Sequence, residues 1–243
     1  MKEISRRRSK EKMNGETVQM IMTLVGGLAL FIFGMNFMSD GLQKAAGDKM
    51  RSILALLTKN PVLGVVAGAL VTAVLQSSSA TTVMVIGFVS AGLMKLPQAI
   101  SIILGANIGT TITAQLIAFN IGDYAWAFVA VGFILYFFMK KKEFISYIGQ
   151  TTFGFGVLFV GINIMGDTME QLASSQVFVD LMMQVQDIPV LGVLLGTCMT
   201  VIVQSSSATI AVLQNLASTA GPDGITSIIG LQDALPILFG DNI

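Results

Sequence analysis

One segment of this chain occurs twice. Residues 61–81 and 189–209 lie 128 positions apart, align without a gap and are identical at 13 of 21 positions. Both copies begin with Pro-Val-Leu-Gly-Val and end with Gln-Ser-Ser-Ser-Ala-Thr. The same local structure is therefore expected twice, and the fold must consist of two related halves.

The repeat extends beyond this segment in both directions. Upstream, residues 34–40 align with 161–167, and downstream Gly-Ala-Asn-Ile at 105–108 aligns with Gly-Asp-Asn-Ile at 240–243. The first copy continues with Gly-Thr-Thr and further apolar sequence, whereas the second copy stops at this point. We therefore expect the chain to be truncated in its second repeat, or to be part of a longer protein.

The composition places both halves in a membrane. Hydrophobic residues make up 53% of the chain, charged residues only 12%, and the mean hydropathy is +0.78. Soluble domains carry about 25% charged residues, so an integral membrane protein with several spans is expected, with the lipid bilayer as its partner. The 14 basic and 14 acidic residues balance, and they form no excess of positive charge for nucleic acid.

The apolar segments divide the chain into a basic tail at 1–17, transmembrane repeat 1 at 18–139 and transmembrane repeat 2 at 144–243. Full-length spans are expected at 18–38, 97–119, 124–139 and 144–165. A basic tail before an apolar run also resembles a signal peptide. The match between 34–40 and 161–167 argues instead for a structural first helix.

Two segments, at 61–94 and 189–217, each consist of two apolar arms, and each arm is too short to cross the membrane completely. Each has two apolar arms separated by Gln-Ser-Ser-Ser, which predicts a re-entrant helical hairpin with a polar tip. The chain then crosses the membrane three times between corresponding points of the two repeats. Because three is an odd number, the second repeat is inverted in the membrane relative to the first. We expect an all-α polytopic protein with two inverted repeats. Its orientation stays open, because six basic residues in the tail compete with eight elsewhere.

The polar tips are the first candidates for a binding site. They comprise Gln76, Ser77, Ser78, Ser79, Gln204, Ser205, Ser206 and Ser207. A buried amide or hydroxyl without a partner costs about 1–3 kcal/mol. A single serine in a membrane helix usually bonds to its own backbone, but four polar residues in a row, present twice, favour a site. Their oxygens suit Na⁺, and backbone N–H groups opening the second arm suit an anion such as phosphate.

A second candidate follows the first hairpin. The run 105–111 is rich in glycine, which predicts an unwound stretch with Asn107, Thr110 and Thr111 as supporting Na⁺ positions. Asn242 is the matching residue of the second copy. The alternative is a packing face of small residues, which is also how we interpret the glycine pairs within 61–81 and 189–209.

Other chemistry is disfavoured by what the chain lacks. It has no histidine, which excludes His-based catalytic triads, zinc sites and proton relays. A serine nucleophile would need a base, and Lys95 is the only basic side chain near the polar tips, so an enzyme is not expected. No cofactor is expected either, apart from Na⁺ as the coupling ion. Proton coupling normally uses carboxylates inside the membrane, for which Asp233 and Asp241 are the exceptions to follow.

Paired Gln-Ser-Ser-Ser segments, each followed by Gly-x-Asn-Ile, resemble the type II sodium-dependent phosphate cotransporter family, including its bacterial members. The resemblance covers 20–243 and implies a multi-pass protein of the plasma membrane that moves inorganic phosphate with Na⁺. It also implies that both hairpin tips share one site for substrate and Na⁺. Many bacterial members add a soluble regulatory domain, and we expect none within residues 1–243. A transporter of another small anion, and a non-transporting phosphate sensor or scaffold, are the alternatives.

Overall fold

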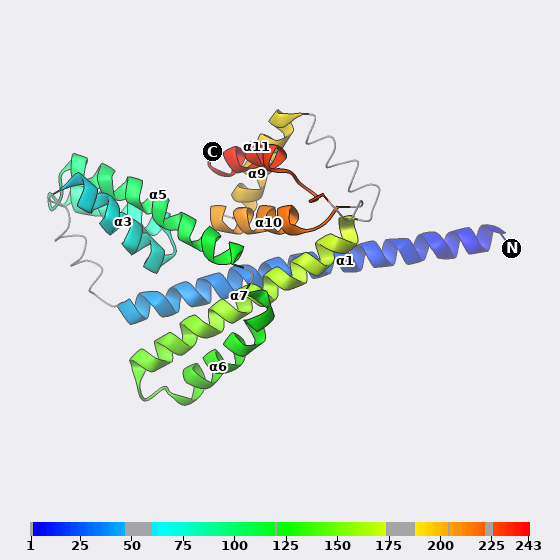
Figure 1. Cartoon of the computed structure of the whole chain (residues 1–243), viewed down its shortest axis with the longest axis horizontal. Helices are drawn as coiled ribbons and strands as arrows, with labels where there is room; N and C mark the ends of the chain where they lie inside the picture. Colours follow the sequence, from blue (N-terminus) through cyan, green and yellow to red (C-terminus); the bar gives the residue numbers. More distant parts are fainter. Residues whose placement is uncertain (1, 47–59, 120, 174–187, 204, 222–225) are drawn as a thin grey trace. The chain divides into compact units, whose positions relative to one another are not determined.

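The computed structural model describes residues 2–46, 60–119, 121–173, 188–203, 205–221 and 226–243, and it is built from helices (Figure 1). In chain order these are α1 (Lys2–Ala46), α3 (Pro61–Leu75), α4 (Ser78–Ser90), α5 (Leu96–Ala118), the 3₁₀ turn η1 (Gly122–Tyr124), α6 (Ala125–Phe138), α7 (Glu143–Ala173), α9 (Pro189–Val203), α10 (Ser206–Ser218) and α11 (Leu231–Asp241). The described residues contain no strand beyond one isolated bridge, between Ala220 and Ser227. The all-helical expectation is confirmed for these residues.

Among the residues that the structure describes, three helical segments are long and apolar enough to cross a membrane: Val18–Ala46, Leu96–Ala118 and Glu143–Gln171. The first belongs to α1, which is continuous from Lys2 and so includes the expected basic tail. The expected span at 124–139 is shorter than predicted. Its α6 has 14 residues, a rise of about 21 Å, because Tyr124 lies in η1 and Met139 ends the helix.

The described chain forms two compact units, and α1 and α7 contribute to both. Unit 1 comprises Met1–Ile32 and Val160–Ile243, and unit 2 comprises Phe33–Phe159. Unit 1 therefore contains the second copy of the repeated segment, and unit 2 contains the first. Each unit is described by itself below.

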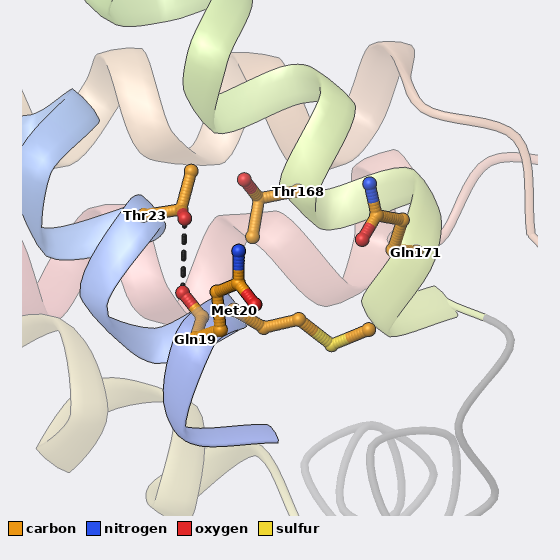
Figure 2. A pocket seen from close by; sticks show the side chains of 5 residues that line it. All are labelled: Gln19, Met20, Thr23, Thr168 and Gln171. Carbon is orange, nitrogen blue, oxygen red and sulfur yellow. Dashed lines mark hydrogen bonds between the residues drawn. The ribbon is translucent and has the colours of Figure 1, made fainter. Parts of the chain in front are cut away.

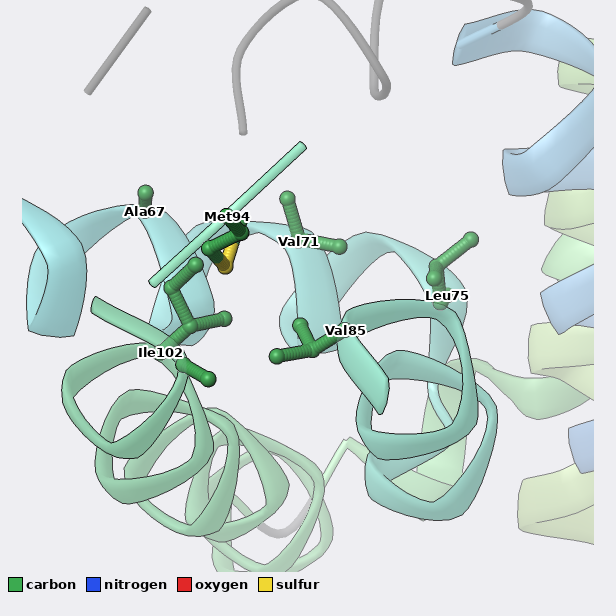
Figure 3. Close-up of a cluster of buried hydrophobic side chains, with 7 residues drawn as sticks. Ala67, Val71, Leu75, Val85, Met94 and Ile102 are labelled. Carbon is green, nitrogen blue, oxygen red and sulfur yellow. The ribbon is translucent and has the colours of Figure 1, made fainter. Parts of the chain in front are cut away.

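In unit 2, glycines bring α3 and α5 into backbone contact. A Cβ atom built on Gly68 would lie 2.1 Å from the carbonyl oxygen of Ile102, and one on Gly105 would lie 2.0 Å from that of Val65. No side chain fits at such distances, so glycine is required for the two helices to approach this closely. Beside this contact lies an apolar cluster formed by Ala67, Val71, Leu75, Val85, Met94, Ala99 and Ile102 (Figure 3).

The remainder of unit 2 is held by α1, α6 and α7. Gly34 of α1 and Gly154 of α7 each lie against the other helix, since a Cβ atom on either would fall within 2.4 Å of its backbone. Aromatic rings fill the spaces between these helices. The Phe37 ring contacts Tyr136 and Phe153 edge-on, with ring centroids 5.4 and 5.7 Å apart, which is a favourable geometry for aromatic pairs.

Unit 1 repeats the glycine contact of unit 2. A Cβ atom on Gly196 of α9 would lie 2.0 Å from the carbonyl oxygen of Ile237, and one on Gly240 of α11 would lie 2.0 Å from that of Val193. These four residues align with Gly68, Ile102, Gly105 and Val65 of unit 2. The two copies therefore pack their helices through the same backbone contacts. The apolar cluster of unit 1 contains Met169, Leu213, Leu216, Ile229 and Ile237.

Candidate functional site

In unit 2, the polar tip is a break between α3 and α4 at Gln76 and Ser77. Gln76 has φ 53° and ψ 27°, and it is the only described non-glycine residue with a positive φ. This left-handed conformation costs roughly 1–2 kcal/mol for a residue with a Cβ atom. It ends α3, and its N–H group donates to the carbonyl oxygen of Thr72 at 2.7 Å.

Hydrogen bonds hold the Gln76 side chain in place. Its Oε1 accepts a hydrogen bond of 2.6 Å from the hydroxyl of Thr113, on α5. Its Nε2 donates to the carbonyl oxygen of Ala73. Thr113 is buried, so the break is joined by a hydrogen bond to a buried residue of α5. The orientation of the Gln76 side chain is therefore fixed at both ends of its amide group.

Ser77 begins α4. Its backbone is extended, and its hydroxyl accepts a hydrogen bond of 3.1 Å from the N–H group of Ala80. This is the usual geometry of a helix N-cap. Ser78 and Ser79 follow in the first turn of α4, where Ser78 is half-buried and Ser79 is exposed. The first N–H groups of a helix have no partner within it, so this turn presents N–H donors beside the two serine hydroxyls.

Unit 1 contains the same break between α9 and α10. Ser205 has φ −150° and ψ 110°, against −150° and 104° for Ser77, and its hydroxyl accepts from the N–H group of Ala208 at 3.3 Å. Ser206 and Ser207 are half-buried in the first turn of α10. Gln204 lies outside the described residues. The local geometry that follows Gln76 in the first copy therefore recurs in the second.

Behind each break lies a pair of threonine hydroxyls that the sequence analysis did not single out. Thr72 donates to Thr81 at 2.9 Å in unit 2, and Thr200 and Thr209 lie 3.1 Å apart in unit 1. The pairs occupy equivalent positions in the two copies. Both threonines are identical in the two copies of the aligned segment, so the sequence alone could have pointed to them.

In unit 1 the pair is extended by Asp241, at the end of α11. The hydroxyl of Thr200 donates to Asp241 Oδ1. Asp241 is 4% exposed, and its Oδ2 is buried without a hydrogen-bond partner among the described residues. The aligned residue of the first copy is Ala106. The second copy therefore has a buried carboxyl group where the first has a methyl group.

The prediction of an unwound stretch at 105–111 is wrong, because α5 is continuous from Leu96 to Ala118. Its glycines serve packing instead: a Cβ atom on Gly109 would lie 2.5 Å from the carbonyl oxygen of Ala69. Thr110 and Thr111 donate to the carbonyl oxygens of Ala106 and Ile108 in their own helix.

The two asparagines predicted as supporting positions lie on the surfaces of their units. Asn107 is exposed on α5. Asn242 caps the end of α11, where its side chain donates to the carbonyl oxygen of Leu238 at 2.8 Å. The structure joins Gln76 to Thr113, but it does not bring Asn107, Thr110 or Thr111 into hydrogen bonds with the serine tips.

Unit 1 also has a pocket of about 320 Å³ between α1 and α7. Figure 2 shows its lining residues, Gln19, Met20, Thr23, Thr168 and Gln171. The hydroxyls of Thr23 and Thr168 donate to carbonyl oxygens of their own helices. None of the predicted site residues that the structure describes lines this pocket.

Known proteins resemble this chain along most of its length. The uncharacterized protein YqeW of Bacillus subtilis is 32% identical over 226 residues, which are 92% of this chain and 71% of YqeW. The "Putative inorganic phosphate export protein YjbB" of Escherichia coli (strain K12) is 26% identical over 223 residues, or 92% of this chain and 40% of that protein.

A shorter similarity reaches animal transporters. The rat "Sodium-dependent phosphate transport protein 2A" is 37% identical over 106 residues, which are 43% of this chain and 17% of that protein. This chain thus spans less than half the length of either named phosphate transporter. No solved structure matches it. The profile of the Na⁺/Pi-cotransporter family matches residues 30–167 and 160–243, and the chain belongs to that family of membrane transporters.

Proposed function

We propose that the chain is the membrane part of a Na⁺-coupled secondary transporter of inorganic phosphate. The observation that carries this proposal is the duplicated break. In both units a serine caps a helix, and two further serines occupy the first turn. Two such turns offer N–H and hydroxyl donors to the oxygens of a phosphate, with no need for a basic side chain.

Sodium would use the oxygen atoms of the same tips. Hydroxyl, amide and carbonyl oxygens are hard ligands of the kind small cations of groups 1 and 2 prefer. Oε1 of Gln76 accepts a hydrogen bond from Thr113 and has a second lone pair for a cation. The proposal also includes supporting positions for Na⁺ outside the tips. These are Asn107, Thr110 and Thr111, which lie in the continuous helix α5, and Asn242, at the end of α11.

In the membrane, each helix pair would form a re-entrant hairpin. Both α3 and α9 have 15 residues, a rise of about 22 Å, and they would end inside a hydrocarbon core of about 30 Å. The inverted arrangement requires η1 and α6, residues 122–138, to cross as the third span. We place this multi-pass protein in the plasma membrane. Alternating access would then act around two tips at similar depth.

The experiment is radiolabelled phosphate flux in proteoliposomes, with and without an imposed Na⁺ gradient. Influx and efflux are both measured, because the YjbB relative is named for export. We expect Ser78→Ala and Ser206→Ala to lower Na⁺-dependent flux at least about tenfold, which is the loss of roughly 1.4 kcal/mol of binding.

The matched controls are Ser90→Ala and Ser218→Ala, the same substitution at the opposite ends of α4 and α10. Their flux should equal that of the wild type. Wild-type flux in both site variants would remove the serines from the site. Flux of another anion that phosphate does not inhibit would favour a different substrate, and saturable phosphate binding without flux would favour a sensor.

A further inference from the structure

The two copies differ in the polar groups of one helix contact. The contact between α9 and α11 contains Thr197 and Asp241, where the contact between α3 and α5 contains Ala69 and Ala106. The hydroxyl of Thr197 donates to the carbonyl oxygens of Val193 and Gly240, at 2.9 and 3.0 Å. Thr197 and Asp241 therefore contribute oxygen atoms at two positions where the contact between α3 and α5 has alanine methyl groups.

Asp241 also changes the direction of the hydroxyl chain behind the break. In unit 2, Thr72 donates to Thr81, and Thr81 donates to the carbonyl oxygen of Ser77 at 3.1 Å. In unit 1, Thr200 donates to Asp241 instead. Since a hydroxyl has one proton, Thr209 is then left to donate to Thr200, to the carboxyl group of Asp241, or over 3.4 Å to the carbonyl oxygen of Ser205.

An ionised Asp241 would need a compensating positive charge. A buried carboxylate without compensation costs several kcal/mol, and here one oxygen accepts a hydrogen bond while Oδ2 accepts none among the described residues. Protonation would remove the charge, and a proton on Oδ1 could be donated to Thr200, but Oδ2 would still have no hydrogen-bond partner among the described residues. A small cation would satisfy both the charge and the free lone pairs.

We propose that Asp241, together with the hydroxyls of Thr200 and Thr209, binds one small monovalent cation inside unit 1. One carboxylate balances one positive charge, and the ligands are all hard oxygens, which favours Na⁺ over softer metals. This adds to the proposed function a cation site distinct from the serines of the two tips. It does not depend on phosphate as the substrate, and its test therefore measures cation binding.

The test is equilibrium binding of ²²Na⁺ to the purified protein in detergent micelles, with choline keeping the ionic strength constant. Wild-type protein should bind ²²Na⁺ saturably. Asp241→Asn should lose one site or weaken it at least about tenfold, and Thr200→Val should weaken it less. Asp233→Asn, the other carboxylate of α11, and Thr72→Val, the equivalent hydroxyl of unit 2, should bind as the wild type does.

Unchanged affinity and capacity in Asp241→Asn would overturn the proposal, as would the absence of saturable ²²Na⁺ binding by wild-type protein. If Asp241→Asn is not monodisperse, Thr200→Val and Thr209→Val decide: weaker binding in both supports the site, and unchanged binding in both overturns it. Phosphate flux is measured after the same proteins have been reconstituted into proteoliposomes. Its absence in a protein that binds ²²Na⁺ through Asp241 would refute the transport proposal alone.

Discussion

The hydroxyl of Thr113 donates a hydrogen bond of 2.6 Å to Oε1 of Gln76, which lies 37 residues earlier in the chain. It joins the interior of α5 to the one described non-glycine residue with a left-handed backbone. A strained backbone persists where its surroundings hold it in place, and such residues are often found at binding sites. The bond connects the packing of unit 2 to the geometry of the tip that we propose binds phosphate.

Thr113→Val should therefore weaken both stability and flux. Valine fills the same space but leaves Oε1 of Gln76 without its donor, which costs about 1–3 kcal/mol where the group is buried. We expect a lower melting temperature in detergent and a reduced Na⁺-dependent phosphate flux. The control is Thr152→Val, at an exposed hydroxyl that bonds only to its own helix. Equal effects of the two substitutions would contradict the proposed connection.

A second prediction concerns the glycine contacts. Gly68→Ala and Gly196→Ala would place a Cβ atom 2.1 and 2.0 Å from carbonyl oxygens of the facing helix. Backbone must move to relieve this, so we expect a loss of about 1–3 kcal/mol, as for other overpacked interiors. Gly87→Ala in α4 meets nothing within 4 Å and should be stabilising by about 0.5–1 kcal/mol. Thermal unfolding of the three variants measures both signs, and a stable Gly68→Ala would refute the close contact.

Much of this fold is predictable because the helix signals are local and occur in both copies of the repeat. Pro61 and Pro189 open helices, and the serines after the apolar arms cap the next ones. Both features depend on neighbouring residues only, and both breaks lie where the sequence analysis placed the polar tips. The re-entry of the hairpins and the inversion of the repeats stay predictions, because they concern the membrane.

The errors arise where a residue's role depends on a distant partner. Glycine weakens an isolated helix, which led to the expectation of unwinding at 105–111, yet Gly105 and Gly109 face α3 backbone and the helix continues. Thr113 and Asp241 were not proposed as site residues, because their partners, Gln76 and Thr200, lie 37 and 41 residues away. Comparing the two copies position by position would have identified Asp241, since it replaces Ala106.

A third prediction concerns the end of α3. The hydroxyl of Ser39 and Nε2 of Gln43, both on α1, donate to the carbonyl oxygen of Leu75 at 2.7 and 3.1 Å. That carbonyl lies at a helix end and has no partner within the helix. Either Ser39→Ala or Gln43→Ala leaves one donor, so each should cost about 1 kcal/mol. The double variant should cost at least about 0.5 kcal/mol more than their sum. Additive losses in thermal unfolding would show that the donors act independently.

The last prediction separates the serines of one tip by their roles. Ser77 caps α4 through its hydroxyl, and removal of a serine cap costs about 1 kcal/mol. Ser78 begins the helix with a half-buried hydroxyl, for which we propose phosphate as the partner. Ser77→Ala should therefore lower the melting temperature, whereas Ser78→Ala should change stability by less than about 0.5 kcal/mol and still lose flux. In unit 1, Ser205→Ala should likewise lower the melting temperature, and Ser206→Ala should lose flux with little change in stability. A Ser78→Ala protein that loses stability as Ser77→Ala does would indicate a structural role for both serines, because a residue that contacts only the substrate contributes nothing to folding in its absence.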